Sequence, residues 1–306
     1  MALAADLTRE EHRTKAMASI GMTIGTVFAL SLIIAPALNR LIGVPGIFIM
    51  TGILALLAIL VVYKIIPNPQ LCRFHSDTEA APARFINVLQ DPELLRLNFG
   101  VFALHATLMA LWLVVPVSLR KAGLEVDDHW QIYLPVLVIS MLLIIPAIIY
   151  SEKKVKLKPV FSIAVFLLLV SQGLLTLTLD SIPGMAIALL VFFAAFNLLE
   201  ASLPSLISKI SPVGAKGTAI GVYSSIQFLG AFTGATAGGY LYEHHGSPAL
   251  FAFCGTLLAL WLVLAITMKA PAAVRTKMYH VQEMETGKAN ELSRELASLN
   301  GVHEAL

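Results

Sequence analysis

The amino-acid sequence predicts an all-α membrane protein, a bundle of eight transmembrane helices followed by a partial α/β tail. Three observations support this fold class. Of the 306 residues, 58% are hydrophobic and 13% are charged, whereas a soluble domain carries about 25% charged residues. Apolar segments of about 20 residues recur along the chain, and this is the length with which a helix crosses a bilayer. Lysine and arginine concentrate in alternate loops, as in multi-pass proteins.

Eight segments satisfy the length and hydropathy expected of membrane spans. Glycine and proline mark the turns between them, most clearly Gly43 with Pro45 and Gly246 with Pro248. Prolines inside the spans, such as Pro36, are compatible with helices because neighbouring helices can satisfy the freed backbone groups. The expected spans are residues 16–41, 47–66, 95–119, 131–150, 159–179, 183–208, 218–242 and 248–268.

The distribution of positive charge predicts which ends of the spans face the cytoplasm. With the N-terminus inside, 18 of the 21 lysines and arginines fall on the cytoplasmic side. The opposite side holds only Arg40, Arg120 and Lys121. Because cytoplasmic loops carry the excess of positive charge, we expect both termini in the cytoplasm.

The first two spans repeat the last two at an offset of 203 residues, which aligns the turn at Gly43 and Pro45 with the turn at Gly246 and Pro248. Four further spans precede the second copy, so two equivalent halves would require about four more helices upstream of Met1. The expected units are the last two helices of a first half (1–66), a cytoplasmic loop between the halves (67–92), a complete six-helix second half (93–270) and a cytoplasmic tail (271–306).

Three segments give the chain a resemblance to the major facilitator superfamily, and within it to the YajR-type bacterial inner-membrane transporters. They are DLTREEHRTKAMASIG (6–21), DPELLRLNFG (91–100) and FNLLEASLPSLISKISPVGAKGTAIGVYSSIQFLG (196–230). The resemblance implies that the eight spans are helices five to twelve of a twelve-helix transporter, and that Met1 falls at the end of helix four. It also implies proton-coupled carriage of drugs or metabolites, and a ferredoxin-like cytoplasmic domain after the last span.

One motif departs from the pattern of the family. Drug antiporters carry G-x-x-x-G-P-x-x-G-G on helix five, and the matching stretch here keeps only the proline, Pro36. Ser31, Ala35, Asn39 and Arg40 stand at the glycine positions. The departure weakens the assignment to antiporters in particular.

The tail pattern indicates a strand at 279–282, a helix and the start of a second strand at 301. Leu292, Leu296 and Leu299 have the spacing of one helix face. The tail resembles the opening of the ferredoxin-like module without the metal-binding CxxC. One helix and one strand cannot bury a core, so the module is expected to be incomplete.

Glu200 and His105 are the candidate ionisable residues in the interior of the expected spans, away from the span ends where Arg40, Lys64 and Arg96 lie. Burying such groups in a bilayer is costly, which makes them candidates for a proton or substrate site. Glu200 is either a proton-binding carboxylate or a structural acceptor paired with Lys209 or Lys216. His105, near the middle of its span, either lines a substrate cavity or bonds to a neighbouring helix.

Four uncharged polar residues on four different spans are further candidates. They either line a cavity or form hydrogen bonds between helices worth about 0.6 kcal/mol each. These residues are Asn98, Gln172, Asn197 and Gln227.

Small residues and lysines form two further patterns. Gly217, Gly221, Gly230, Gly234 and Gly238 recur at intervals of four within two runs, which lets a neighbouring backbone approach closely. A basic cluster lies in a short inner loop. It either anchors the topology and contacts lipid headgroups, or it is the second-half counterpart of the gating motif of the family. It consists of Lys153, Lys154, Lys156 and Lys158.

The residue types exclude several functions and leave two open. Glu243, His244 and His245 make a poor metal site because adjacent side chains diverge, so we expect neither metal nor cofactor. No nucleophile with a base recurs inside the spans, which argues against an enzyme. We expect a monomer whose partners are membrane lipid, a small-molecule substrate and protons, without nucleic acid. The function is either secondary transport or that of a truncated membrane fragment inactive in transport.

Overall fold

The computed structural model describes residues 10–66, 82–153, 157–211 and 215–269, together with Lys288, Leu292, Glu295 and Leu296. Every regular element in these ranges is helical, as expected from the sequence. In chain order the elements are α2 (Glu10–Lys64), α3 (Pro82–Gln90), α4 (Pro92–Lys121), the 3-10 helix η1 (Val126–Asp128), α5 (Trp130–Lys153), α6 (Leu157–Thr178), α7 (Ile182–Ile210) and α8 (Lys216–Thr267).

The longest elements, α2 and α8, each consist of two helical arms joined at a glycine. The backbone leaves the helix at Gly43, with φ 67° and ψ 174°, and at Gly246, with φ 75° and ψ −176°. Only glycine adopts this conformation readily. The two corners lie 203 residues apart in the sequence and have nearly the same backbone angles, as expected for the two copies of a repeat.

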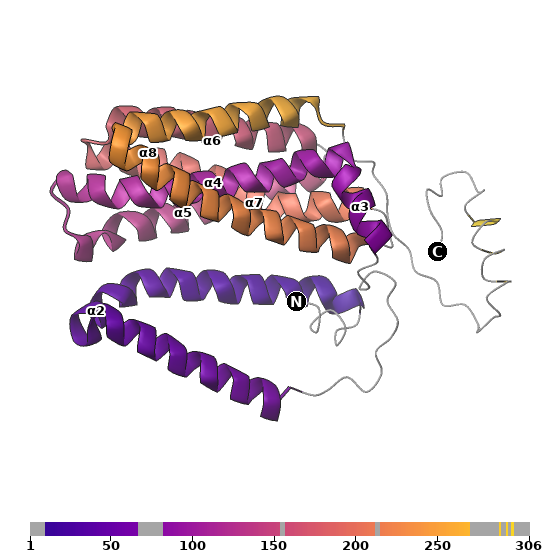
Figure 1. The fold of residues 1–306 in the computed structure, drawn as a ribbon, viewed down its shortest axis with the longest axis horizontal. Coiled ribbons are helices and arrows are strands. Elements are labelled where there is room, and N and C mark those ends of the chain that lie inside the picture. Colours follow the sequence, from indigo (N-terminus) through magenta and orange to yellow (C-terminus); the bar gives the residue numbers. More distant parts are fainter. Residues whose placement is uncertain are drawn as a thin grey trace.

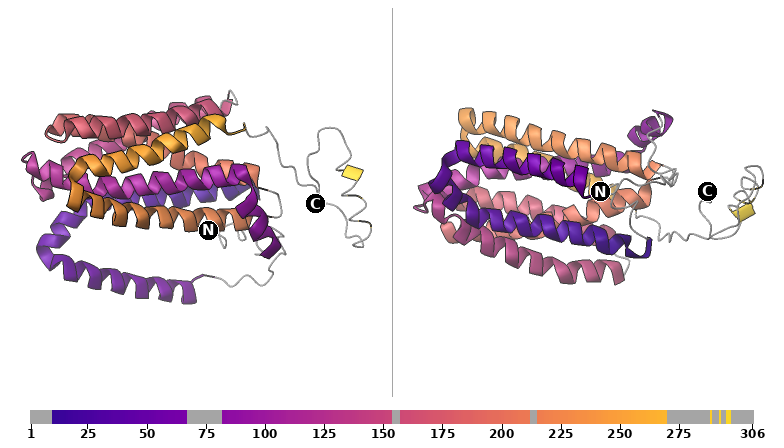
Figure 2. Two further views of the ribbon diagram at one scale, coloured as in Figure 1. Left: turned by 45° about the horizontal axis from the view of Figure 1, so that its top comes forward. Right: turned by 90° about the horizontal axis from the view of Figure 1, so that it is seen from below.

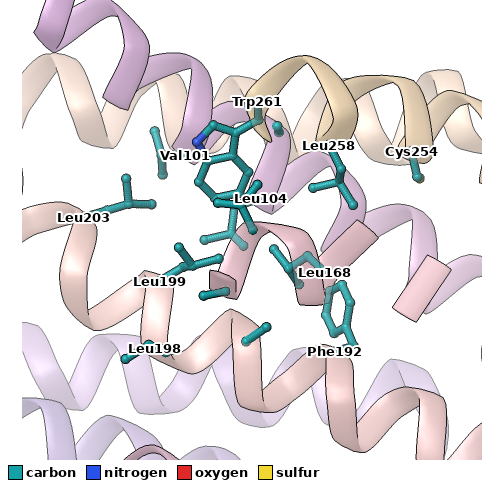
Figure 3. Packing of buried hydrophobic residues seen from close by; sticks show 14 of the residues in the cluster. Val101, Leu104, Leu168, Phe192, Leu198, Leu199, Leu203, Cys254, Leu258 and Trp261 are labelled. Carbon is teal, nitrogen blue, oxygen red and sulfur yellow. The ribbon is translucent and has the colours of Figure 1, made fainter. Parts of the chain in front are cut away.

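α4 lies inside a bundle formed with α5, α6, α7 and α8 (Figure 1). Asp91 caps its first turn by accepting hydrogen bonds from the backbone of Glu93 and Leu94, at 2.8 and 3.0 Å. In its most apolar stretch 61% of the residues are buried. Figure 3 shows part of the shared apolar core, in which Trp261 of α8 lies beside Val101 and Leu104 of α4.

α2 lies beside this bundle as a hairpin (Figures 1 and 2). None of the most apolar stretch of its segment Ile34–Lys64 is buried, and large apolar side chains such as Leu41, Phe48 and Leu56 are exposed. Its corner at Gly43 lies at the same end of the molecule as the connection between α4 and α5.

An ion pair joins this corner of α2 to η1. Arg40 donates two hydrogen bonds to Oδ2 of Asp127, one from Nε at 2.7 Å and the other from Nη2. The two residues are 87 positions apart in the sequence. The pair therefore connects α2 to η1, which follows α4 in the chain.

Within the described residues, five segments are long and apolar enough to cross a membrane. They are Ile34–Lys64, Pro92–Lys121, Lys158–Thr178, Ile182–Ile207 and Gly217–Thr267. The first and last of these contain the glycine corners. The helical membrane-protein class predicted from the sequence is therefore confirmed.

Two segments, residues 67–92 and the C-terminal tail, were given specific expectations from the sequence. The stretch 67–92 was expected to be a loop, but its last part forms the helix α3. The expected ferredoxin-like tail lies mostly outside the described residues. Lys288, Leu292, Glu295 and Leu296, which belong to its expected helical part, are helical.

Candidate functional site

Polar side chains from three helices meet at His105 in the interior of the bundle. His105 lies on α4, Glu200 on α7 and Gln227 on α8. Nε2 of His105 is 2.8 Å from Nε2 of Gln227 and 3.7 Å from Oε2 of Glu200. From the sequence these three residues are separate candidates on different spans, and in the structure they lie next to one another.

The hydrogen bonds of His105 define which ring nitrogen carries the proton when the imidazole is neutral. Nδ1 is 3.1 Å from the carbonyl oxygen of Val101, which can only accept, so Nδ1 is the donor. The lone pair of Nε2 then accepts a hydrogen bond from the amide of Gln227. When Nε2 is also protonated it becomes a donor, and the Glu200 carboxylate faces it. The cluster thus offers His105 a different partner in each protonation state.

Glu200 is less enclosed by the bundle than His105, which it faces. Its Oε2 atom is buried and has no hydrogen-bond partner among the described residues. The side chain as a whole keeps 37% of its surface exposed, whereas that of His105 keeps 9%. One edge of the carboxylate therefore faces the enclosed imidazole while the rest remains accessible. The side chains of Lys209 and Lys216, its alternative partners, lie outside the described residues.

Glycines of α8 bring its backbone against α4 beside this cluster. A Cβ atom at Gly230 would lie 2.8 Å from Cα of Phe102, and one at Gly234 would lie 2.5 Å from Cα of Ala106. The contacts advance by four residues on each helix, so α4 and the first arm of α8 run in the same direction in close contact. Because Ala106 follows His105 in the sequence, this contact also fixes the level at which α8 meets the histidine.

The other small residues named from the sequence are less crowded. A Cβ at Gly238 would lie 3.3 Å from Cβ of Ala110, and one at Gly221 would meet nothing within 4 Å. Gly217 is exposed, and Pro36 lies half-buried within α2. The close approach between backbones is therefore located at Gly230 and Gly234.

The remaining candidate amides do not join the cluster. Asn197 of α7 donates to Oγ of Ser140 on α5, at 3.1 Å, and so connects two helices. Asn98 and Gln172 are each 2% exposed. Oδ1 of Asn98 and both amide atoms of Gln172 lack a hydrogen-bond partner among the described residues. Asn98 lies seven residues before His105 on α4, about 10 Å along the helix.

A series of aromatic contacts, which the sequence interpretation missed, extends from His105 to Tyr133. The rings of His105 and Phe196 meet edge to face, with centroids 5.9 Å apart. The contacts continue from Phe196 to Phe193 at 6.4 Å and from Phe193 to Trp112 at 6.2 Å. Trp112 in turn lies 5.0 Å from Tyr133 of α5. In an apolar helix the pattern of these aromatics does not distinguish a site from ordinary core, so no signal in the sequence identified them.

The basic cluster and His244 form no further site among the residues that the structure describes. Lys154 and Lys156 lie outside the described residues, as does the side chain of Lys153, and Lys158 is half-exposed in α6. Nδ1 of His244 lies 3.0 Å from the carbonyl oxygen of Tyr240 in its own helix. In the part of the chain that the structure describes, no three His, Cys, Asp or Glu residues are grouped to hold a metal ion.

Comparison with known proteins gives one family match and several relatives. The model of the Major Facilitator Superfamily matches residues 1–153 and 97–279. Inner membrane transport protein YajR of Escherichia coli (strain K12) is 38% identical over 307 residues, which cover 100% of this chain and 67% of YajR. An uncharacterized transporter of Buchnera aphidicola subsp. Acyrthosiphon pisum is 28% identical over 235 residues, covering 76% of this chain and 60% of the relative. Multidrug resistance protein MdtH of Aeromonas salmonicida is 26% identical over 226 residues, covering 72% and 54%.

Proposed function

The chain belongs to the Major Facilitator Superfamily, and we propose that it is a secondary transporter that carries out proton-coupled export of drugs or small metabolites by alternating access. It is a multi-pass protein of the bacterial inner membrane, in keeping with its apolar helices and its similarity to an inner membrane transport protein. The chain spans about two thirds of the length of YajR. A relative named for multidrug resistance supports export as the direction.

In this proposal the helical arms correspond to helices five to twelve of a twelve-helix transporter. α2 and α8 provide two arms each, and α4, α5, α6 and α7 provide one each. The matching corners at Gly43 and Gly246 support the pairing of α2 with α8 as equivalent hairpins. With both termini in the cytoplasm, these corners and the ion pair of Arg40 with Asp127 face the outside.

The observation that carries the proposal is the meeting of Glu200 and Gln227 at Nε2 of His105. Proton coupling requires a group that gains and loses a proton within the bundle and changes its contacts as it does so. Neutral His105 accepts from Gln227, and protonated His105 is suited to pair with Glu200. A proton arriving at this site thus exchanges one interhelical contact for another, which is how binding can favour one arrangement of the helices.

Transport by the purified chain in proteoliposomes tests the proposal. The assay imposes an acidic lumen and follows accumulation of ethidium, a lipophilic cation used as the probe. The matched variants are Glu200→Gln and, on the same helix, Ser202→Ala, whose hydroxyl donates to the backbone carbonyl of Leu198 at 2.7 Å and to no other described residue. We expect accumulation with the unmodified chain and with Ser202→Ala, but only the rate of protein-free vesicles with Glu200→Gln.

Two results would contradict the proposal. Equal accumulation by Glu200→Gln and the unmodified chain, at equal levels of folded protein, would remove Glu200 from proton coupling. Absence of gradient-driven ethidium movement with the folded, unmodified chain would favour the alternative, a membrane fragment of a transporter that is inactive in transport.

A further inference from the structure

The side chain of Tyr223, on α8, is buried in the bundle and takes no part in the contacts described above. The residue is 4% exposed and belongs to the shared apolar core. Its Oη atom has no hydrogen-bond partner among the described residues. Buried tyrosine hydroxyls usually have a partner, since leaving one unpaired costs free energy. The hydroxyl of Tyr223 therefore requires a partner in at least one state of the protein.

The position of Tyr223 along α8 places it next to the polar cluster at His105. It precedes Gln227 by four residues, which is one helical turn or about 6 Å along the axis. It precedes Gly230 by seven residues, so it lies on nearly the same side of α8 as the glycine that touches the backbone of Phe102. Tyr223 thus lies on the side of α8 that faces α4, one turn nearer than Gln227 to the start of the helix.

Glu200 carries an acceptor that matches this hydroxyl. The two groups are close enough for the charge of the Glu200 carboxylate to act on the hydroxyl of Tyr223. Oε2 of Glu200 is also buried and also lacks a hydrogen-bond partner among the described residues. A carboxylate oxygen only accepts hydrogen bonds, and a hydroxyl has one hydrogen to donate. The unpaired donor on α8 and the unpaired acceptor on α7 are therefore complementary.

The ionisable side chains around Glu200 come from two of the helices packed against α7, which are α4, α5, α6 and α8. Among the described residues, Glu200 interacts with His105 of α4 and with Tyr223 of α8. Tyr133 of α5 instead packs against an aromatic side chain of α4, and Lys158 lies half-exposed in the first turn of α6. In the part of the chain that the structure describes, His105 and Tyr223 are therefore the ionisable groups that face the carboxylate.

We propose that Tyr223 is a positioning residue of the proton site, and that its hydroxyl donates to Oε2 of Glu200 when His105 is neutral. The proposal rests on the proposed proton binding at His105 and Glu200. Neutral His105 has no proton for Glu200, because its Nδ1 donates to Val101 and its Nε2 accepts from Gln227. An ionised carboxylate in the bundle then needs another donor, which Tyr223 supplies after a rotation of the Glu200 side chain. When His105 is protonated, its Nε2 becomes the donor that faces Glu200 at 3.7 Å, and the carboxylate turns from α8 to α4.

Infrared spectroscopy of the full chain in lipid vesicles tests the proposal without a transport assay. The bands of the Glu200 carboxyl group are followed as the pH is raised, and they are assigned by their loss in Glu200→Gln. Tyr223→Phe removes the hydroxyl and keeps the ring. We expect this change to alter the frequency of the Glu200 carboxylate stretch at high pH, where His105 is neutral. We also expect the midpoint of the titration to rise by about 1–2 pH units, because a hydrogen bond to a charged group is lost.

Tyr133→Phe is the matched control. Tyr133 is 5% exposed, and its hydroxyl also lacks a partner among the described residues, but it lies on α5. We expect the Glu200 bands and their midpoint to stay as in the unmodified chain. Replacement of Tyr223 by 3-fluorotyrosine keeps the hydroxyl and makes it a stronger donor, so the midpoint should move to lower pH. This second variant decides the question if Tyr223→Phe does not yield folded protein, judged by gel filtration.

Failure of this inference can be told apart from failure of the proposed function. If the Glu200 bands titrate identically in the unmodified chain and in both variants at position 223, the hydroxyl does not bond to Glu200, whereas the proton site stands. If Tyr133→Phe moves the midpoint as far as Tyr223→Phe, the effect comes from a general change in the bundle and the inference is wrong. If no band that Glu200→Gln removes depends on pH, the proton site itself is wrong, and this inference with it.

Discussion

Gly234 has no space for a side chain because the backbone of α4 passes directly over it. A Cβ at this position would meet Cα of Ala106 at 2.5 Å, whereas a Cβ at Gly221 on the same arm of α8 would meet nothing within 4 Å. The two glycines therefore form a matched pair on one helix, one required by close packing and one free of it.

Gly234→Ala is expected to destabilise the protein, because both backbones would have to separate. Overpacking of this kind costs about 1–3 kcal/mol. Gly221→Ala should be neutral or stabilising by up to about 1 kcal/mol, since alanine is the better helix former. Thermal unfolding of the purified variants in detergent measures both. Equal melting temperatures for the two variants would show that α4 and α8 are not in backbone contact at Gly234.

Some residues of the candidate site could be predicted from the sequence, but their arrangement could not. His105, Glu200 and Gln227 could be named because polar groups are rare and costly within membrane spans. Their meeting could not be foreseen, since it depends on the rotation and level of three helices, which packing contacts such as that of Gly234 determine. Phe196 beside His105 was not recognisable, because an aromatic residue in an apolar helix has the same appearance in core, lipid contact and site.

At the scale of elements, the two corners have a common physical basis. Gly43 and Gly246 combine positive φ with extended ψ, a conformation that costs a side-chain-bearing residue of order 1–3 kcal/mol. In both hairpins a proline two residues later begins the second arm, with Cδ 3.7 and 3.6 Å from where a Cβ would lie on the glycine. Each hairpin thus depends on one residue for its change of direction.

Gly43→Ala and Gly246→Ala should therefore each lower the free energy of unfolding by about 1–3 kcal/mol through the same backbone strain. The control is Gly52→Ala, in the second arm of α2, where a Cβ has no neighbour within 4 Å. Chemical denaturation in mixed micelles would compare the three variants. A loss at Gly52 as large as at the corners would mean that helix formation, and not the turn, is affected.

The elements also show where prediction from sequence fails. The corners were predicted because Gly-x-Pro recurs at an offset of 203 residues, and a repeated turn signal is specific. The helix α3 was missed because nine residues that begin with proline give too short a periodic pattern to stand out within a polar loop. Its stability comes from packing on α4 and α8, which the local sequence does not contain.

At the scale of the whole molecule, the pair of Arg40 and Asp127 connects α2 to the rest of the chain. It crosses between residues 87 positions apart, and its side chains are 68% and 37% exposed. An exposed ion pair contributes only about 0.2–1 kcal/mol, and salt screens it. The pair is therefore suited to set the position of α2 relative to η1 and not to hold the fold together.

Reversing one charge of this pair should widen the distribution of distances between α2 and η1. Spin labels at the exposed positions Ile42 and Val126 would report the distances by pulsed electron resonance. We expect broader distributions for Arg40→Asp and for Asp127→Arg, and recovery when both changes are combined. Asp128→Arg is the control, because Asp128 bonds to Gln131 instead, at 3.0 Å. Unchanged distributions for both single reversals would exclude a positioning role for the pair.

The cluster at His105 joins two helices in close backbone contact, α4 and α8, to a third helix, α7. His105 and Gln227 lie on helices whose backbones touch at Gly230 and Gly234, so these two residues keep their mutual distance when other helices shift. Glu200 belongs to α7, which makes no glycine contact of this kind with α4 among the described residues, so a shift of α7 would change its 3.7 Å separation from His105. In the proposed proton-coupled cycle, a small displacement of α7 would alter how strongly the Glu200 carboxylate favours a proton on His105, so helix movement and histidine charge would be linked at one interatomic distance.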